Sequence, residues 1–177
     1  MQPAVSSPRA RLALTLASVF LLGLAAPAWT FDTPAARSTL KGIKALRVQI
    51  APLPTDLQRL GLAWDQLQAD VELRLRQAGI AVAPAEAIAT PILWVILNSH
   101  PRGDSFAVSF SNRVDLVQFV QLARDTSIGA PAPTWGVDTV GTGDLHPTEA
   151  NRTAFRDFVR ELVDRFINAY LEQNPKP

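Results

Sequence analysis

Apolar side chains recur at helical spacing near the carboxyl-terminal end of the chain. Over residues 155–170 they follow one another at intervals of three and four, with charged side chains on the opposite face. That charged face mixes Asp, Glu and Arg, whereas a helix that lies in a membrane surface presents a basic band. We therefore expect this helix to form part of the domain's own core, with a surface for a partner as the alternative.

A second helix and a first strand are predicted earlier in the chain. Residues 64–78 repeat apolar side chains at spacings of three and four, and Gly79 stands where a left-handed helix end is expected. Residues 45–50 alternate apolar and polar side chains, which predicts a half-buried strand. Pro52 and Pro54 cannot donate hydrogen bonds to a sheet, so they end this strand.

Three further strands are predicted in the middle of the chain. Residues 92–97 are six consecutive apolar residues, which is typical of a central strand covered on both faces and is followed by a predicted turn. Residues 106–122 alternate over a length that is unusual for one strand, so we expect a bend or bulge near residues 111–113. The Gly- and Pro-rich residues 125–133 are expected to form a loop before a strand at residues 134–140.

This order of elements predicts a single domain. The order β-α-β-β-β-α implies an α+β fold, in which two main helices cover a mostly antiparallel sheet. We place the single α/β domain at residues 45–174. It follows an irregular lead-in at residues 29–44, where Pro, Ser, Thr and mixed charge show little periodicity.

The amino terminus has the three parts of a secretory signal peptide. Arg9 and Arg11 form a short basic region, residues 12–26 form an apolar run, and Ala26-Pro27-Ala28 is a small-x-small cleavage site. The run is shorter than the roughly 20 apolar residues of a membrane-spanning helix. We predict that residues 1–28 are cleaved on export and leave no stable membrane span. An uncleaved amino-terminal anchor is the alternative.

Charge and cysteine content narrow the class of protein. The chain carries 17 Lys+Arg against 16 Asp+Glu, and loss of Arg9 and Arg11 leaves 15 against 16, which is nearly neutral. Such a domain has no global attraction to nucleic acid, and no Lys/Arg cluster interleaves with aromatic residues. The chain has no cysteine, so an exported domain must fold without disulfides, which fits a bacterial periplasm. We expect a periplasmic or secreted protein.

Few residues favour catalysis, cofactor binding or metal binding. Gly141-Thr-Gly-Asp-Leu-His146 follows a predicted strand, but His146 replaces the third glycine of a dinucleotide turn, so we interpret it as a flexible turn. His100, His146 and Asp144 could supply three metal ligands only if the fold brought them together. Ser99 and Ser105 lie in no nucleophile-elbow motif. We predict no catalytic, cofactor-binding or metal-binding residue.

Two short motifs match known recognition sequences. Arg102-Gly103-Asp104 matches a cell-adhesion tripeptide, which we interpret as a turn. Asn151-Arg152-Thr153 matches the N-glycosylation sequon, but we expect it to start the last helix. Neither motif therefore indicates a partner.

Two segments carry a family resemblance. "RVQIAPL" (residues 47–53) and "LRLRQAGIAV" (residues 73–82) are similar to a strand with a proline-containing end, then a helix that ends at glycine and a short strand. This pattern resembles the periplasmic α/β domains of the TolB amino-terminal and CsgG type, and short exported bacterial proteins. The chain lacks their lipoprotein cysteine, pore-forming hairpin and propeller domain, so no functional residue is carried over. The resemblance implies a non-enzymatic binding or assembly role in the envelope.

Three functional hypotheses follow. The favoured one is a non-enzymatic interaction or assembly module of the cell envelope, which contacts an unknown envelope protein through a sheet edge or an exposed strand. The second is a small-ligand carrier with a pocket under residues 106–122, lined by Trp94 or Trp135. The third is an enzyme with a site at His146 and Asp144. The sequence leaves the partner, the ligand and the oligomeric state open.

Overall fold

The computed structural model describes residues 31–103 and 106–175 of the 177-residue chain. The predicted signal peptide lies outside the described residues. In chain order the elements are α1 (Pro34–Ser38), β1 (Ala45–Ile50), α2 (Thr55–Leu60), α3 (Trp64–Gln77), β2 (Ala81–Val82), β3 (Ile92–Pro101), β4 (Ala107–Leu122), β5 (Asp125–Asp144) and α4 (Glu149–Gln173).

The strands form one mixed sheet in the order β2-β1-β3-β4-β5. β1 pairs in parallel with β2 and β3, whereas the long strands β3, β4 and β5 pair antiparallel. Parallel pairing of β1 with β3 requires a crossover connection, and α2 and α3 lie within it. The predicted α+β class, with a mostly antiparallel sheet in a single domain, is confirmed.

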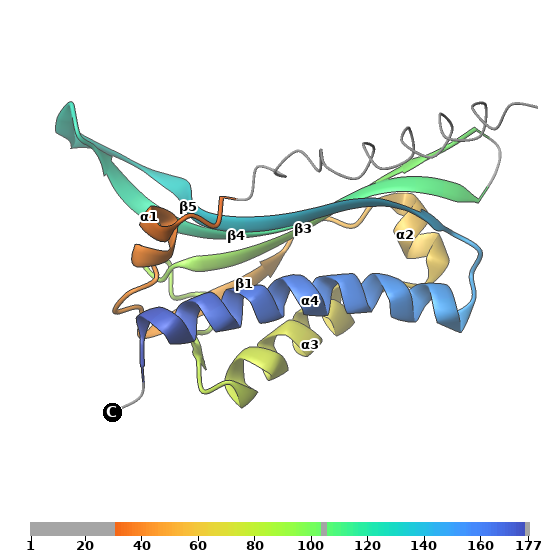
Figure 1. Ribbon diagram of the computed structural model, residues 1–177, viewed down its shortest axis with the longest axis horizontal. Helices are drawn as coiled ribbons and strands as arrows, with labels where there is room; N and C mark the ends of the chain where they lie inside the picture. Colours follow the sequence, from red (N-terminus) through yellow and green to blue (C-terminus); the bar gives the residue numbers. More distant parts are fainter. Residues whose placement is uncertain (1–30, 104–105, 176–177) are drawn as a thin grey trace, which may run out of the picture.

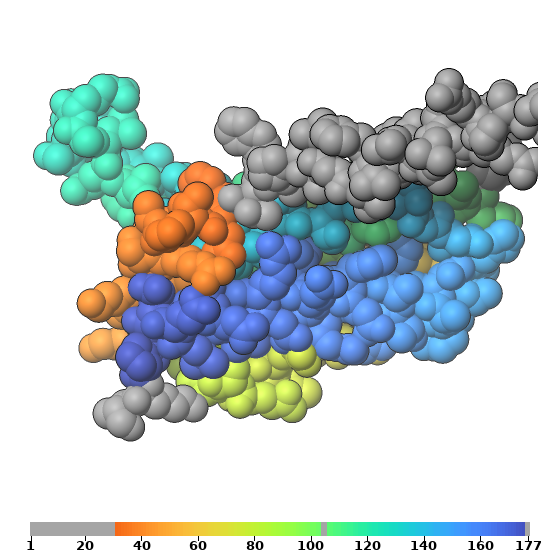
Figure 2. Space-filling model, in the orientation of Figure 1, coloured from red at the N-terminus to blue at the C-terminus, as the bar shows by residue number. Residues whose placement is uncertain are grey.

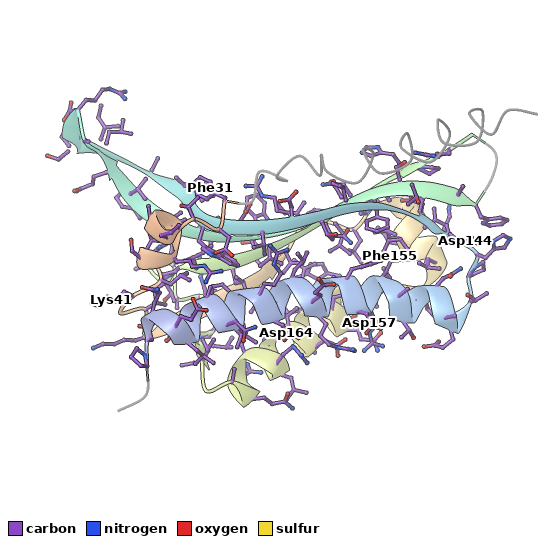
Figure 3. All side chains as sticks on the ribbon, in the orientation of Figure 1. Phe31, Lys41, Asp144, Phe155, Asp157 and Asp164 are labelled. Carbon is purple, nitrogen blue, oxygen red and sulfur yellow. The ribbon has the colours of Figure 1, made fainter. Side chains whose placement is uncertain are left out.

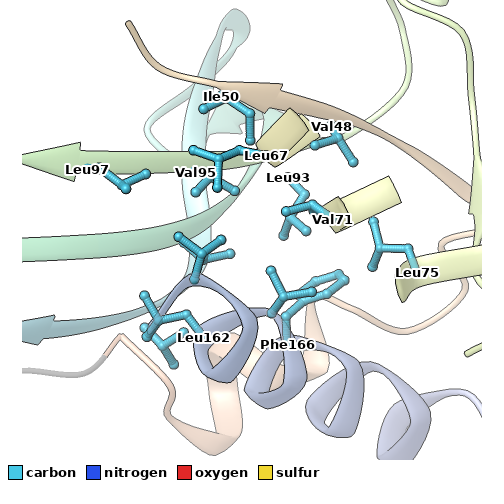
Figure 4. Packing of buried hydrophobic residues seen from close by; sticks show 14 of the residues in the cluster. Val48, Ile50, Leu67, Val71, Leu75, Leu93, Val95, Leu97, Leu162 and Phe166 are labelled. Carbon is cyan, nitrogen blue, oxygen red and sulfur yellow. The ribbon is translucent and has the colours of Figure 1, made fainter. Parts of the chain in front are cut away.

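α3 and α4 cover one face of the sheet (Figure 1). The strand side chains that face them are fully buried, and Leu46, Leu93 and Leu116 are each 0% exposed. Figure 4 shows Leu162 and Phe166 of α4 turned toward the buried residues of the sheet and of α3. The interpretation of the last helix as core is therefore confirmed. The buried residues of α4 are Phe155, Val159, Leu162, Val163, Phe166, Ile167 and Ala169.

α3 ends at the predicted glycine. Gly79 has a φ of +83°, which side chains with a Cβ rarely adopt. The N–H of Ile80 donates to the carbonyl oxygen of Leu75 (2.9 Å), and the N–H of Gly79 donates to that of Arg76 (2.9 Å). This is the Schellman pattern of hydrogen bonds, and it satisfies two carbonyl groups that the helix end would otherwise leave unpaired.

Short elements lie where the sequence pattern predicted none. α1 lies within the predicted lead-in. It can form there because Thr33 Oγ1 accepts a hydrogen bond from the Ala36 N–H (3.1 Å) and Pro34 occupies the first turn. The expectation of an irregular lead-in is wrong for these five residues. α2 follows Pro54 and ends at Gly61, which has a φ of +97°. Helices this short complete fewer than two turns, so no helical period is visible in them.

The segment that contains α1 is fastened to β5 and to the end of α4. Trp135 Nε1 donates to Asp32 Oδ1 (2.7 Å), and Asp32 forms an ion pair with Arg37 (2.7 Å). Arg37 also reaches Glu172 of α4 (2.5 Å). The hydrogen bond from Arg37 is the main cause that lowers the pKa of Asp32. Residues more than a hundred positions apart are thus joined in one network.

β3 is longer than predicted, and among the described residues helices cover only one of its faces. It continues through the residues that we expected to turn, as far as Pro101. Leu93, Val95 and Leu97 are buried, but Trp94 is 37% exposed and Ile96 is half-buried. The expectation of two covered faces is wrong, because α3 and α4 both pack on the same side of the sheet. We call the opposite side the open face.

β4 and β5 form a two-stranded ribbon that extends beyond the helix-covered body (Figure 1). Residues 125–133 belong to β5, so the predicted loop is wrong; Pro131 and Pro133 are tolerated because β5 is an edge strand. The bend or bulge expected near residues 111–113 is also wrong, because the register of β4 with β5 is unbroken from Ala107 to Leu116. Asn112 keeps its place on the buried face at 1% exposure. The first register shift instead lies between Leu116 and Val117, opposite the extra residue Thr134.

Phe166 tests whether α4 is part of the core. Its ring is fully buried and lies 5.3 Å from the ring of Trp135, centroid to centroid. We expect Phe166→Ala to lower the free energy of unfolding by about 3–5 kcal/mol, because it removes a large buried side chain and leaves a cavity. Urea denaturation followed by circular dichroism measures the change. The control Ile88→Ala, at a site that is 85% exposed, should stay within about 0.5 kcal/mol of the native protein. Equal effects of the two substitutions would contradict the packing.

Candidate functional site

Asp144 is the last residue of β5, and His146 follows it in the turn before α4; Figure 3 labels Asp144. Asp144 Oδ1 accepts a hydrogen bond from the His146 backbone N–H (2.8 Å) and lies 2.6 Å from His146 Nδ1. These hydrogen bonds, first from the backbone and then from the ring, lower the pKa of Asp144. The ring of His146 stacks on Phe106 at 3.7 Å between centroids. Both side chains of the pair are 53% exposed, so it is a solvated turn that leads into α4.

The structure also places His100, the third candidate metal ligand, and the glycine-containing motif at residues 141–146. His100 lies on β3 opposite Ser109. Across residues 31–103 and 106–175, no three His, Asp or Glu side chains are grouped to hold a metal ion. The expectation of a flexible turn is wrong for residues 141–144, which belong to β5. Gly141 leaves room for the ring of Phe110, since a Cβ there would lie 2.7 Å from Phe110 Cζ.

The two recognition motifs occupy the ends of elements. Arg102 and Gly103 lie between β3 and β4, and Gly103 has a φ of +62°. Asp104, the last residue of the tripeptide, lies outside the described residues. Asn151 lies in the first turn of α4, where its N–H donates to Thr148 Oγ1 (3.2 Å) and its Nδ2 donates to the His146 carbonyl oxygen (3.0 Å). The interpretation of this motif as a helix start is confirmed.

Sequence reasoning missed a buried carboxylate on the open face. Asp115 of β4 is only 3% exposed and accepts a hydrogen bond from Arg113 Nε (2.7 Å). Burial raises the pKa of Asp115, and the bond from Arg113 opposes that shift. Asp115 lies opposite Gly136, where a Cβ would come within 2.3 Å of Asp115 Oδ1. The sequence did hold a sign of this residue, because Asp115 interrupts an apolar stretch of the predicted strand. An acidic side chain requires a hydrogen-bonding partner when it is buried.

A hollow of about 340 Å³ lies on the open face near this carboxylate. Trp135 is fully buried, donates to Asp32 and packs on Phe166, so it cannot line a pocket that is open to a ligand. That part of the ligand-carrier hypothesis is wrong. The described lining also lacks Trp94, and consists of Phe31, Asn98, Ser111, Asn112, Arg113, Gly136, Val137 and Asp138.

A smaller groove of about 170 Å³ lies between α3 and α4. Ion pairs of Arg74 with Asp164 and of Arg156 with Asp70 (2.6 Å) connect the two helices along it. These side chains are about one third to one half exposed, so each pair contributes only about 0–1 kcal/mol. The charges on the groove are matched within the chain, so we interpret it as the seam between the helices.

Two large apolar side chains are exposed where the ribbon leaves the body. We call residues 118–133 the ribbon tip, and Figure 2 shows that it stands clear of α4. Phe119 is 71% exposed and Ile128 is 45% exposed. The ring of Phe119 lies over Gly129, where a Cβ would be 2.3 Å from Phe119 Cζ. An aromatic ring placed over a glycine of the neighbouring strand helps to fix register, but the ring and Ile128 still face solvent.

Comparisons with known proteins give no family for this chain. No family model matches it, and no curated protein matches it. Among solved structures, a minor lipoprotein from Acinetobacter baumannii has a TM-score of 0.37 at 11% identity, over 77% of this chain and 99% of that chain. A PelC dodecamer structure from Paraburkholderia phytofirmans has a TM-score of 0.40 at 19% identity, over 78% and 92%. TM-scores this low describe a partial likeness of fold and carry no functional argument. The resemblance to TolB and CsgG domains stays a prediction.

Within residues 31–103 and 106–175, no helix is both long enough and apolar enough to cross a membrane. The apolar run at residues 12–26 lies outside this range. Its cleavage therefore stays a prediction.

Gly136 tests the close approach of β5 to Asp115. We expect Gly136→Ala to lower the free energy of unfolding by about 1–3 kcal/mol, because the new Cβ displaces a buried carboxylate that is bonded to Arg113. Thermal or urea unfolding measures the change. Gly143→Ala is the matched control on the same strand, because its Cβ would meet side chains at ordinary distances of 3.6 Å and more. A Gly136→Ala protein as stable as the control would contradict the geometry.

The raised pKa of Asp115 predicts a pH dependence of stability. The folded pKa lies above the ordinary value of 3.8, so ionised Asp115 costs free energy that disappears as the pH falls through the folded pKa. We expect the free energy of unfolding of the native protein, relative to Asp115→Asn, to rise as the pH is lowered from neutral toward 3.8. Urea denaturation of both proteins over a pH series measures this difference. A difference that falls in that range would show that the ion pair with Arg113 dominates.

Proposed function

We propose that this protein is an exported, non-enzymatic interaction or assembly module of the cell envelope, periplasmic or secreted, and that the ribbon tip contacts an envelope protein. The observation that carries the proposal is the tip itself. It extends beyond the body while Phe119 and Ile128 remain exposed. Apolar side chains that stay exposed on a projecting ribbon can be covered by contact with another protein.

The low intrinsic stability of a projecting two-stranded ribbon supports a contact with a partner at the tip. An isolated two-stranded ribbon is only marginally stable in water, and the tip stands clear of α4 (Figure 2). Strand edges and exposed strands bind partners by main-chain hydrogen bonds, while alternate side chains fit pockets of the partner. A partner that covers Phe119 and Ile128 would supply the apolar contacts that the body of the domain does not.

The location follows from the amino terminus. Arg9 and Arg11, the apolar run at residues 12–26 and the Ala26-Pro27-Ala28 site support export. The absence of cysteine from the whole sequence suits an exported bacterial domain that folds without disulfides. These features support the envelope as the place where the partner is met.

The non-enzymatic part of the proposal rests on the chemical inventory. The sequence has two histidines and no cysteine, and histidine is the side chain most often used in acid–base catalysis. Asp144 lies against His146, but the pair is solvated and serves the turn before α4. We therefore assign these residues a structural role.

Crosslinking in living cells tests the proposed contact. A photoreactive amino acid at position 126 of the tip should capture an envelope protein, identified by mass spectrometry. We expect Ile128→Asp to reduce that capture several-fold, because it places a charge within an apolar contact. Ile88→Asp is the matched control, since Ile88 is 85% exposed but lies between β2 and β3. Capture that is equal in both variants, or no capture from the native tip, would overturn the proposal.

A further inference from the structure

The outer edge of β5 offers backbone groups that have no partner in the described chain. The Leu145 N–H donates to the Phe106 carbonyl oxygen (2.8 Å), so odd-numbered residues here point their N–H groups toward β4. The Gly136 N–H points the other way and donates to the Phe31 carbonyl oxygen (3.4 Å). By this alternation, Asp138, Val140 and Thr142 point their N–H and C=O groups away from the sheet.

These outward groups lie on a strand whose side chains are small or exposed. Val140 is 72% exposed, in contrast to its neighbour Val137 at 1%. Within residues 31–103 and 106–175, no helix or strand pairs with this edge beyond Gly136. An unpaired edge of this kind is a template for another strand unless charge, proline or a bulge blocks it.

The sequence of the edge is complementary to itself in a register centred on Val140. When two copies pair antiparallel about an axis at Val140, Val140 faces Val140 of the second copy and Asp138 faces Thr142. Asp144 then faces Gly136, so no like charges lie opposite each other. Pairing about Gly141 would instead place Asp138 against Asp144, which is unfavourable. Pairing about Thr139 would place Gly136 opposite Thr142, next to the central pair, although the N–H of Gly136 is already bonded to Phe31. In the register centred on Val140, Gly136 lies beyond residues 138–142.

The same strand limits how far such pairing can extend. Pro131 and Pro133 cannot donate hydrogen bonds, and Thr134 is the extra residue of the bulge. Phe31 covers the strand at Gly136. The pairing is therefore confined to a few residues around Val140, and a two-fold axis uses the same patch on both copies, which closes the assembly at two.

We propose that the protein forms a reversible homodimer, in which residues 138–142 of β5 pair antiparallel with the same residues of a second copy about an axis at Val140. The axis stands perpendicular to the sheet, so α3 and α4 of both copies lie on the same side of a continuous sheet. The two ribbon tips then project from opposite ends. The contact is short, so the dimer is of the weak, exchanging kind.

A single cysteine tests the position of the axis. The native chain has no cysteine, so Val140→Cys carries one thiol per copy. The exported protein, purified with its native termini, should be linked into dimers by a short bis-maleimide reagent. Ile88→Cys, which is also highly exposed, should remain largely monomeric under the same conditions. Equal linking of the two variants, or none at position 140, would overturn the proposal.

Charge substitutions test the register by sedimentation equilibrium. Val140→Lys places two cations opposite each other and should weaken the dimer roughly tenfold. Thr142→Lys should strengthen it, because each new lysine faces Asp138 of the second copy. A substitution that only disturbed the local fold at these exposed sites would not strengthen dimerisation. Sedimentation as a monomer at every concentration, or a dimer that neither substitution alters, would contradict the pairing.

The dimer and the proposed envelope contact can fail separately. Ile128→Asp changes the ribbon tip and should leave the sedimentation of the dimer unchanged. Val140→Lys changes the edge and should leave an intact tip on a monomer. Loss of dimerisation with Ile128→Asp would overturn the assignment of the interface to residues 138–142.

Discussion

The packing of α4 on the sheet is the contact on which the rest of the domain depends. Its buried face meets β4, β5, α3 and α1, so it joins elements from both ends of the chain. Most of the stability of a helix in a protein comes from burial of such a face. Without α4, the fully buried Val114, Trp135 and Leu116 would meet water. The segment that contains α1 is held against the same helix through the ion pair of Arg37 with Glu172.

Because both main helices pack on one side, the two faces of the sheet differ in chemistry. The helix side is a continuous apolar cluster. The open face instead combines Trp94 with a buried acid, Asp115, and its partner Arg113. A charge is accommodated there because Gly136 leaves space for the carboxylate and Arg113 donates to it.

The sequence predicted the elements whose apolar residues repeat at helix or strand spacing over their whole length. α3, β1 and α4 were found because each repeats its apolar residues over its length, and Gly79 marked a helix end that requires positive φ. The covering of β3 was not predictable from its own residues, because six apolar residues in a row look the same whether one face or both are covered. The extent of β5 was missed because Pro131 and Pro133 are typical of loops, and only the edge position of the strand makes them acceptable.

The candidate surfaces were predicted less well than the fold, because they arise from contacts between strands. Asp144 and His146 are close in sequence, so their proximity could be expected. Asp115 and Gly136 are brought together only by the register of β4 with β5, and no local pattern sets that register. The exposure of Phe119 likewise depends on how far the β4–β5 ribbon extends beyond the helices. That length is set by the assembled sheet and not by the local sequence.

The network of Trp135, Asp32, Arg37 and Glu172 joins the beginning of the described chain to its last helix. Asp32 precedes the first helix of the described fold, and Glu172 lies near the end of α4. Contacts between elements this far apart in the sequence couple their local unfolding. Loss of the last turns of α4 would therefore also release the segment that contains α1, so the two ends of the described fold open together.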